Sequence, residues 1–281
     1  MTGIVDTHVH LWDPGIFRYS WLDDLPSLNR PFLPNDFSAT SFGKGVAKMV
    51  FVECGREPHQ ALDEVDWVCR MAETVTSLCG IVAHAPLEKG AAVREDLEKL
   101  ARRPLVKGVR RLLQGESDAS FCLRAEFVAG VRMLADHGFT FDLCIRHEQL
   151  PTATELVKRV PEVRFILDHF GKPPVKAGGV EPWAADLKAL ALQSNVSCKI
   201  SGLTTEADWQ GWTVEQLRPY FEIAMEAFGS DRVLFGGDWP VSTLATGYGR
   251  WLEVVSELSE KIQGVDLTKL FRTNGEKFYG L

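Results

Sequence analysis

GIVDTHVHL, residues 3–11, is the first of eight short apolar runs that decide how this chain of 281 residues folds. Side chains alternate between the two faces of a strand, so Asp6, His8 and His10 should point the same way. Three polar side chains on one face of an apolar strand are costly to bury without partners, a metal or a substrate. Taken alone, the two histidines could equally be core residues, because such a pair arises easily by chance.

Seven further runs rich in β-branched residues follow, at residues 48–55, 78–87, 105–113, 139–146, 163–171, 196–203 and 232–240. Segments with helical spacing of apolar residues alternate with them, at residues 61–75, 93–103, 125–138, 148–160, 182–194, 215–229, 249–262 and 266–279. Strands that alternate with helices indicate parallel βαβ units. Eight units in about 250 residues predict a single-domain α/β protein with a (β/α)8 TIM barrel, and a doubly wound open sheet is the alternative.

Two strand-to-helix segments are longer than turns. Residues 12–37 are rich in proline and aromatic residues, which predicts an ordered irregular loop over the barrel mouth. Residues 204–213 bring Trp209 and Trp212. Such loops form the catalytic end of a TIM barrel, so their aromatic residues could line a pocket, or the loops could simply pack on themselves.

The composition is that of a globular protein, with 45% hydrophobic and 25% charged residues. A formal net charge of −7 and the lack of a long basic run argue against nucleic acid or an anionic membrane as the main partner. The chain shows no signal-peptide pattern, no membrane-spanning run and six widely spaced cysteines, so a cytoplasmic protein with reduced thiols is expected. Neither glycine-rich phosphate-binding motif occurs, so no nucleotide cofactor is expected.

Polar residues gather at the carboxyl ends of the predicted strands, where a TIM barrel places its active site. Asp238 is the most informative, since a carboxylate that follows the buried run VLFGG has no evident structural duty. The two glycines before it leave room for a close approach. His169 could be catalytic or a satisfied core histidine, and His84 is expected to be structural.

Four motifs resemble the amidohydrolase superfamily. They are DTHVHLW at residues 6–12, LDHFGKP at 167–173, SGL at 201–203 and FGGDWP at 235–240. Within the superfamily the chain is most similar to the branch of sugar-acid lactonases, over nearly its whole length. The resemblance implies a distorted (β/α)8 barrel that hydrolyses esters or amides. It also implies an active centre made of His8, His10, His169 and Asp238.

The superfamily binds one or two divalent metals through such residues, but the two-metal pattern is not met here. The fifth run ends with Arg146 and has His147 only on the opposite face, and Lys107 is the only candidate bridging ligand. We therefore expect one zinc ion or no metal. The ligands would be His8, His10, His169 and Asp238.

A lactone needs an activated water and stabilisation of the developing oxyanion. Asp238 is predicted to be the general base that removes a proton from water. His8 and His10 would polarise the carbonyl, directly or by holding zinc. Without a metal, Lys107 or Arg111 would face the oxyanion, although pairing with acidic neighbours is the structural alternative.

The expected substrate is a small sugar lactone, which is flat on one face and hydroxylated on the other. Stacking is assigned to Trp12, Trp209 and Trp239. Hydroxyl binding is assigned to Glu53, Asp142 and Lys172. The alternatives are a metal-dependent decarboxylase of an aromatic or unsaturated acid, and a lactonase for a ring-cleavage dicarboxylate lactone, which would use Lys107 and Arg111 more heavily.

Overall fold

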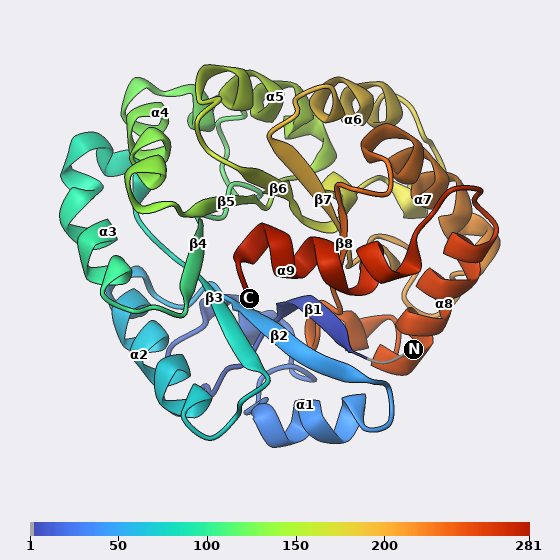
Figure 1. The fold of residues 1–281 in the computed structure, drawn as a ribbon, viewed down its shortest axis with the longest axis horizontal. Helices are drawn as coiled ribbons and strands as arrows, with labels where there is room; N and C mark the ends of the chain where they lie inside the picture. The colour runs from blue at the N-terminus through green and yellow to red at the C-terminus, as the bar shows by residue number, and fades with distance from the viewer. Residues whose placement is uncertain (1–2) are drawn as a thin grey trace.

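The computed structural model describes residues 3–281 and shows eight parallel strands paired in chain order (Figure 1). The strands are β1 Ile4–Val9, β2 Val46–Val52, β3 Leu78–Ala83, β4 Val106–Arg110, β5 Thr140–Leu143, β6 Phe165–Leu167, β7 Val196–Ile200 and β8 Val233–Phe235. Each strand overlaps one of the eight runs predicted from the sequence. The TIM barrel is therefore confirmed, and the open-sheet alternative is wrong.

Most of the helices lie around the strands, and α9 lies across one end of them (Figure 1). They are α1 Pro34–Ser41, α2 Ala61–Ala72, α3 Arg94–Ala101, α4 Ala125–Arg132, α5 Leu150–Arg159, α6 Trp183–Ala191, α7 Val214–Phe228, α8 Tyr248–Glu260 and α9 Asn274–Tyr279. The helix expected at 266–279 is divided, because a π-helical turn at Lys269–Thr273 precedes α9. Within residues 3–281, no helix has both the length and the apolar character needed to cross a membrane.

The barrel closes between β8 and β1 at their carboxyl ends. Val9 and Trp239 form an isolated parallel bridge. The Asp238 main-chain N–H donates to the His8 carbonyl at 2.8 Å, and the His10 N–H donates to the Trp239 carbonyl at 2.7 Å. Main-chain closure therefore brings Asp238 next to both histidines of the first strand.

Helix α9 covers the amino end of the barrel. The Asn274 side chain donates to the carbonyl of Val233, the first residue of β8, at 2.8 Å. Phe278 and Tyr279 enter a small apolar cluster with inward-facing valine, isoleucine and leucine side chains of the strands. The Tyr279 hydroxyl donates to the Asp142 carboxylate at 3.0 Å. This end of the barrel is thus filled, and only the carboxyl end is free to hold a site.

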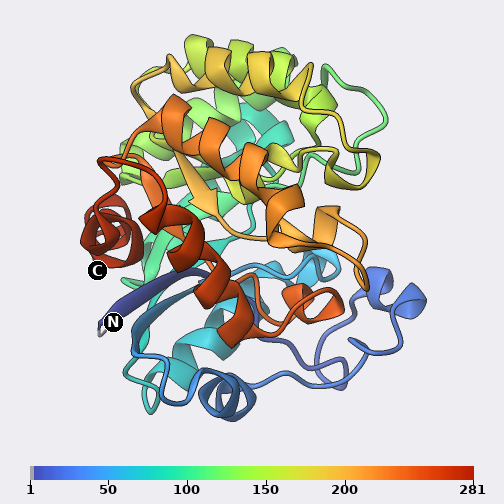
Figure 2. The ribbon, with the colours of Figure 1, turned by 90° about the vertical axis from the view of Figure 1, so that its right-hand side faces the viewer.

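The segment at residues 12–37 is ordered around Trp12. The Trp12 indole N–H lies 2.9 Å from the Arg30 carbonyl, and the Trp12 and Phe32 main chains form an antiparallel bridge. Figure 2 shows the segment, in dark blue, on the side of the barrel away from α9. Helix α1 begins at Pro34, inside the segment expected to be irregular, because proline suits a first helical position and Asp36 caps the Leu33 N–H at 2.8 Å.

Gly130 in α4 allows a test of this packing. An added Cβ would lie 2.0 Å from the Leu87 carbonyl oxygen, a main-chain atom that cannot move alone. Alanine favours a helix over glycine by about 1 kcal/mol, but overpacking costs about 1–3 kcal/mol, so we expect Gly130→Ala to lower the free energy of unfolding in urea. Gly115→Ala is the control, since its Cβ would meet nothing within 4 Å. Equal stability of the two variants would contradict the packing described.

Candidate active site

A cavity of about 420 Å³ opens at the carboxyl ends of the strands. Five of the residues expected at the site line it, namely His10, Trp12, His169, Lys172 and Asp238. The other lining residues are Ser20, Trp21, Leu25, Cys54, Gly55, Arg110, Leu112, Gln114, Cys144, Thr205 and Val241. The segment at residues 12–37 thus contributes one wall of the cavity.

The side chains of His8, His10, His169 and Asp238 converge at the base of this cavity. The Nε2 atoms of His8 and His10 lie 3.1 Å apart. Asp238 Oδ1 lies 3.7 Å from His8 Nε2, 3.5 Å from His10 Nε2 and 3.9 Å from His169 Nε2. The structure therefore brings together the four residues that the sequence motifs placed at the centre.

Two of these residues have left-handed main-chain conformations, with φ of 53° at both His169 and Asp238. A non-glycine residue there costs about 1–3 kcal/mol and persists only where its surroundings hold it. His169 is held by Ser201, whose hydroxyl oxygen lies 2.9 Å from His169 Nδ1. Gly202 follows in the same motif, and a Cβ there would lie 2.5 Å from His169 Nδ1 and 3.1 Å from Asp238 Oδ2. The SGL motif thus leaves space for both side chains.

Asp6 shares the strand with the two histidines but supports the site from behind. Its carboxylate accepts from the main-chain N–H groups of Gly237 at 2.8 Å and His8 at 3.0 Å, and from the Tyr248 hydroxyl at 2.9 Å. Burial raises the pKa of Asp6 to about 6. Gly237 is required at this point, because a Cβ would lie 2.5 Å from the Asp6 carboxylate.

The orientation of the His10 ring is fixed by its partner. His10 Nδ1 lies 2.8 Å from the Val52 carbonyl, which can only accept a hydrogen bond, so Nδ1 donates and Nε2 is turned toward His8 Nε2 and Asp238. Burial lowers the pKa of His169 to about 4. Burial opposes ionisation of Asp238, but the adjacent His169 and His10 outweigh it and lower the pKa of Asp238 below its usual range. Asp238 is therefore a carboxylate at neutral pH.

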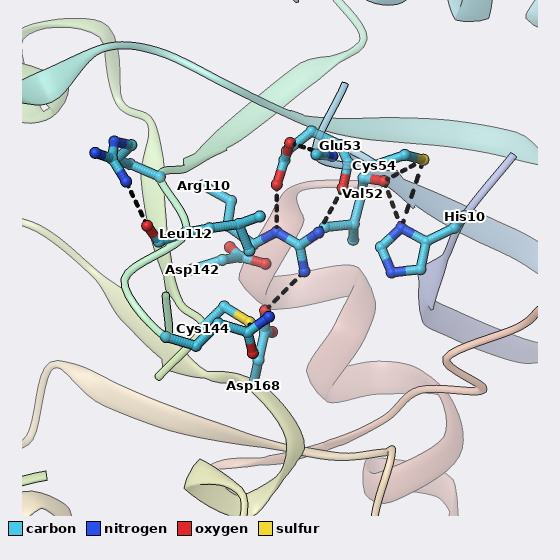
Figure 3. A network of polar contacts seen from close by, with 12 residues as sticks. His10, Val52, Glu53, Cys54, Arg110, Leu112, Asp142, Cys144 and Asp168 are labelled. Carbon is cyan, nitrogen blue, oxygen red and sulfur yellow. Dashed lines mark hydrogen bonds and ion pairs between the residues drawn. The ribbon is translucent and has the colours of Figure 1, made fainter. Parts of the chain in front are cut away.

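A network of buried charges surrounds the centre (Figure 3). Arg110 donates through Nε to Glu53 at 2.9 Å and through a terminal nitrogen to Asp168 at 3.3 Å. Lys199 pairs with Asp168 at 3.0 Å and with Asp142. His8 Nδ1 lies 3.4 Å from Asp168 Oδ1 and 3.2 Å from Lys199 Nζ. The network thus fixes the far side of the His8 ring.

Arg110 and Lys172 are the arginine and lysine side chains that line the cavity, whereas Lys107 and Arg111, which were expected to face the oxyanion, do not line it. Alternation correctly separated Arg110 from Arg111, but the inward face carries Arg110, in register with Asp142 on β5. Arg111 turns away and pairs with Glu88 at 3.2 Å and with Glu116 at 2.7 Å.

Lys107 lies toward the amino end of β4. A Cβ at Gly80 would contact both Lys107 Cγ, at 3.3 Å, and Leu281, at 3.1 Å, and Leu281 follows α9 at the covered end. The pairing of β3 with β4 also shifts register between Ile81 and Val82, which strict alternation along a sequence does not reveal.

Four other expected substrate contacts are not at the cavity surface. Glu53 and Asp142 are buried within the charge network. Trp239 is buried against Phe32, with ring centroids 5.5 Å apart, and Trp209 is 43% exposed with its indole N–H bonded to the Thr205 carbonyl. Glu53, Asp142 and Trp239 therefore support the site from within the core, and Trp209 lies outside it.

Sequence reasoning missed several lining residues. Trp21 forms an aromatic wall beside Trp12, with ring centroids 5.3 Å apart, and its indole N–H donates to the Cys54 carbonyl at 2.8 Å. Gln114 and Thr205 add polar groups. A tryptophan within the proline-rich mouth segment was the available signal for Trp21, whereas nothing in the sequence distinguishes Gln114 from other polar loop residues.

The donor set fits one divalent metal. His8, His10 and Asp238 each present one buried ligand atom to a common point. Tetrahedral zinc with bonds of about 2.0–2.1 Å places its ligand atoms about 3.3 Å apart, close to the separations of 3.1, 3.5 and 3.7 Å between these three atoms. A proton on His8 Nδ1, facing Asp168, would leave Nε2 free to bind, as happens when a carboxylate accepts a hydrogen bond from the other ring nitrogen of a metal-binding histidine.

Comparison with known proteins gives consistent results. The sequence pattern of a family described as amidohydrolase matches residues 5–281. An L-fucono-1,5-lactonase from Burkholderia ambifaria is 30% identical, over 99% of this chain and 96% of the relative. An L-rhamnono-gamma-lactonase from Scheffersomyces stipitis is 26% identical, over 99% and 98% of the two chains. The crystal structure of an amidohydrolase from Burkholderia multivorans with bound zinc covers all of both chains, with a TM-score of 0.89 and 26% identity.

His84, which follows β3, lies outside the catalytic cavity and yields a pH prediction. Burial, assisted by Arg56, lowers the pKa of His84 to about 4, against about 6.5 in an unfolded chain. Between these pH values the unfolded state binds the extra proton, so stability is retained above pH 6.5 and falls as the pH drops toward 4, by up to about 3 kcal/mol. Urea unfolding across this range should show a smaller fall for His84→Gln. Identical pH dependence of the two proteins would contradict the prediction.

Proposed function

This chain belongs to the amidohydrolase family, and we propose that it is a lactonase that opens a sugar-acid lactone by adding water to the ring carbonyl. The observation that carries the proposal is an ionised carboxylate, Asp238, held among three histidines at the base of a cavity of about 420 Å³. Relatives similar over nearly the whole chain are named as sugar lactonases, which supports a cyclic ester as the substrate.

Asp238 acts as the general base in this proposal. Its lowered pKa keeps it ionised at neutral pH, and its main chain is fixed by the hydrogen bond to His8. A carboxylate so held can take a proton from a water molecule in the cavity as that water attacks the carbonyl carbon. The proton then passes to the ring oxygen as the ester bond breaks, which yields the hydroxy acid.

Arg110 takes the role of stabilising the oxyanion. Its guanidinium lines the cavity, and one terminal nitrogen lies 3.4 Å from His8 Nε2, next to the ligand atoms. Arginine stays charged at any pH that the fold tolerates, and pairing with Glu53 and Asp168 fixes its plane. Positive charge held in place before the reaction is the most effective way to stabilise a developing oxyanion.

His8, His10 and Asp238 would hold a divalent metal, with His169 adjacent. When bound, such an ion polarises a carbonyl oxygen and lowers the pKa of a water molecule. The chain's own contribution is orientation: the Val52 carbonyl positions His10, Asp168 positions His8, and Ser201 positions His169.

The remaining lining residues suit a sugar ring. Trp21, which is only partly buried, offers an apolar face on which the less polar face of the ring can pack, and the fully buried Trp12 packs edge-on against it. Gln114, Lys172 and Thr205 offer polar groups for ring hydroxyls. The stacking expected of Trp12, Trp209 and Trp239 therefore falls to Trp21.

The proposal is tested by hydrolysis of a panel of aldonolactones, followed with a pH indicator. We expect turnover of at least one lactone and a loss of about 10²–10⁴ in kcat for Asp238→Asn, because the amide keeps the shape and removes the base. Asp231→Asn, at an exposed carboxylate paired with Lys269, is the matched control and should retain activity. Near wild-type turnover by Asp238→Asn, or release of CO2 from an aromatic acid without lactone opening, would overturn the proposal.

Zinc binding is tested by calorimetry and metal analysis after treatment with a chelator. We expect one site, and His10→Ala should weaken it by more than about 100-fold, since even outer-shell partners are worth about 10–100-fold. His59→Ala, at an exposed histidine outside the centre, should bind zinc as the wild type does. Unchanged binding by His10→Ala would place the metal elsewhere.

A further inference from the structure

A second cavity adjoins the catalytic one. It has a volume of about 190 Å³ and lies beside the loops that follow β5 and β6. We call this cavity the basic cleft. Its charged or titratable lining residues are Arg146, His147, Glu148, Lys172, Lys176 and Glu206. Lys172 also lines the catalytic cavity, so one lysine separates the two spaces.

Cations outnumber carboxylates in the basic cleft by three to two, in a protein whose net charge is −7. Glu148 faces solvent and lies 3.4 Å from His147, while Glu206 lies 4.0 Å from Lys172. The ion pairs of this cleft within residues 3–281 involve His147 and Lys172, whereas Arg146 and Lys176 have no carboxylate within ion-pair distance and are exposed to solvent. Two cations at the cleft are thus available for a ligand.

The wall between the two cavities is held in place. Lys172 has a left-handed main chain, with φ of 51°, and its carbonyl accepts from His147 Nδ1 at 3.1 Å. Pro173 and Pro174 follow and restrict the loop. Lys172 lines both cavities, and its ammonium group lies 4.0 Å from Glu206. The cleft and the catalytic cavity therefore share one positive charge.

We propose that the basic cleft binds a carboxylate on the substrate, so that the preferred substrate is a lactone of a sugar dicarboxylic acid. This inference rests on the proposed lactonase activity. Arg146 offers a planar fork that matches a carboxylate, and Lys176 offers a second positive charge. Gln114 and Thr205 already supply neutral hydrogen-bonding groups in the catalytic cavity, whereas the charged groups lie in the cleft beside it.

The size of the cleft agrees with one small anionic group. The cleft, with a volume of about 190 Å³, has room for a carboxylate with some of its hydration. The carboxylate made by ring opening forms next to Asp238, on the catalytic side of Lys172. The group bound in the cleft is therefore a second acid that the substrate already carries.

The test compares galactonolactone with galactarolactone of the same ring stereochemistry, which differ only in a terminal hydroxymethyl or carboxylate group. We expect kcat/KM to favour the acid by about tenfold, the effect of one charge-assisted hydrogen bond. The double variant Arg146→Gln/Lys176→Gln should lose this preference and keep its rate on the neutral lactone. The matched control is Arg102→Gln/Lys277→Gln, which removes two exposed charges at the covered end of the barrel.

Binding of open-chain galactarate, measured by calorimetry, separates the two proposals. Galactarate that binds the wild type about tenfold more tightly than the Arg146→Gln/Lys176→Gln variant supports the cleft, even if neither lactone is hydrolysed and the lactonase proposal fails. Hydrolysis of both lactones at equal rates overturns the cleft and leaves the lactonase standing. Equal binding of galactarate by the wild type and the Arg146→Gln/Lys176→Gln variant would also overturn the proposed carboxylate site in the cleft.

Discussion

The main-chain hydrogen bond from Asp238 to His8 is the contact on which the site depends. It joins the last strand to the first, so the carboxylate and the histidine pair meet through backbone pairing and need no long side chain to bridge a gap. Gly236 and Gly237 make this possible, because a Cβ at either would overlap His8 or Asp6. Closing the barrel and assembling the catalytic centre are thus one event.

The interior of the barrel uses buried charge to orient that centre. Arg110, Lys199 and their carboxylate partners are almost completely shielded from water, and such groups are tolerated only when each is paired. The pairing contributes little net stability compared with an apolar core, but it fixes the plane of Arg110 and the far side of the His8 ring. The buried charges therefore orient Arg110 and His8. The cost is the desolvation of charged groups, which an apolar interior would avoid.

Much of this fold could be predicted because its signals are local. Each strand is a short apolar run, and the residues of the candidate site lie in short motifs at or just after the ends of strands. Which side of β4 faces the barrel interior could not be predicted. Alternation shows that Arg110 and Arg111 point in opposite directions, but it does not show which of them points inward. Glu53 and Asp142 were expected to bind substrate for a related reason. Only the folded barrel shows that the Glu53 carboxylate is paired with Arg110 and the Asp142 carboxylate with Lys199.

The pairing of β1 with β8 has a consequence for how the protein is made. A ribosome delivers β1 early and β8 only after most of the barrel has been synthesised, so one edge of the buried, apolar first strand has no partner during that time. Unpaired strand edges are the surfaces through which nascent chains associate. The geometry that places Asp238 against His8 therefore exposes the growing chain to aggregation, and molecular chaperones would act during this interval.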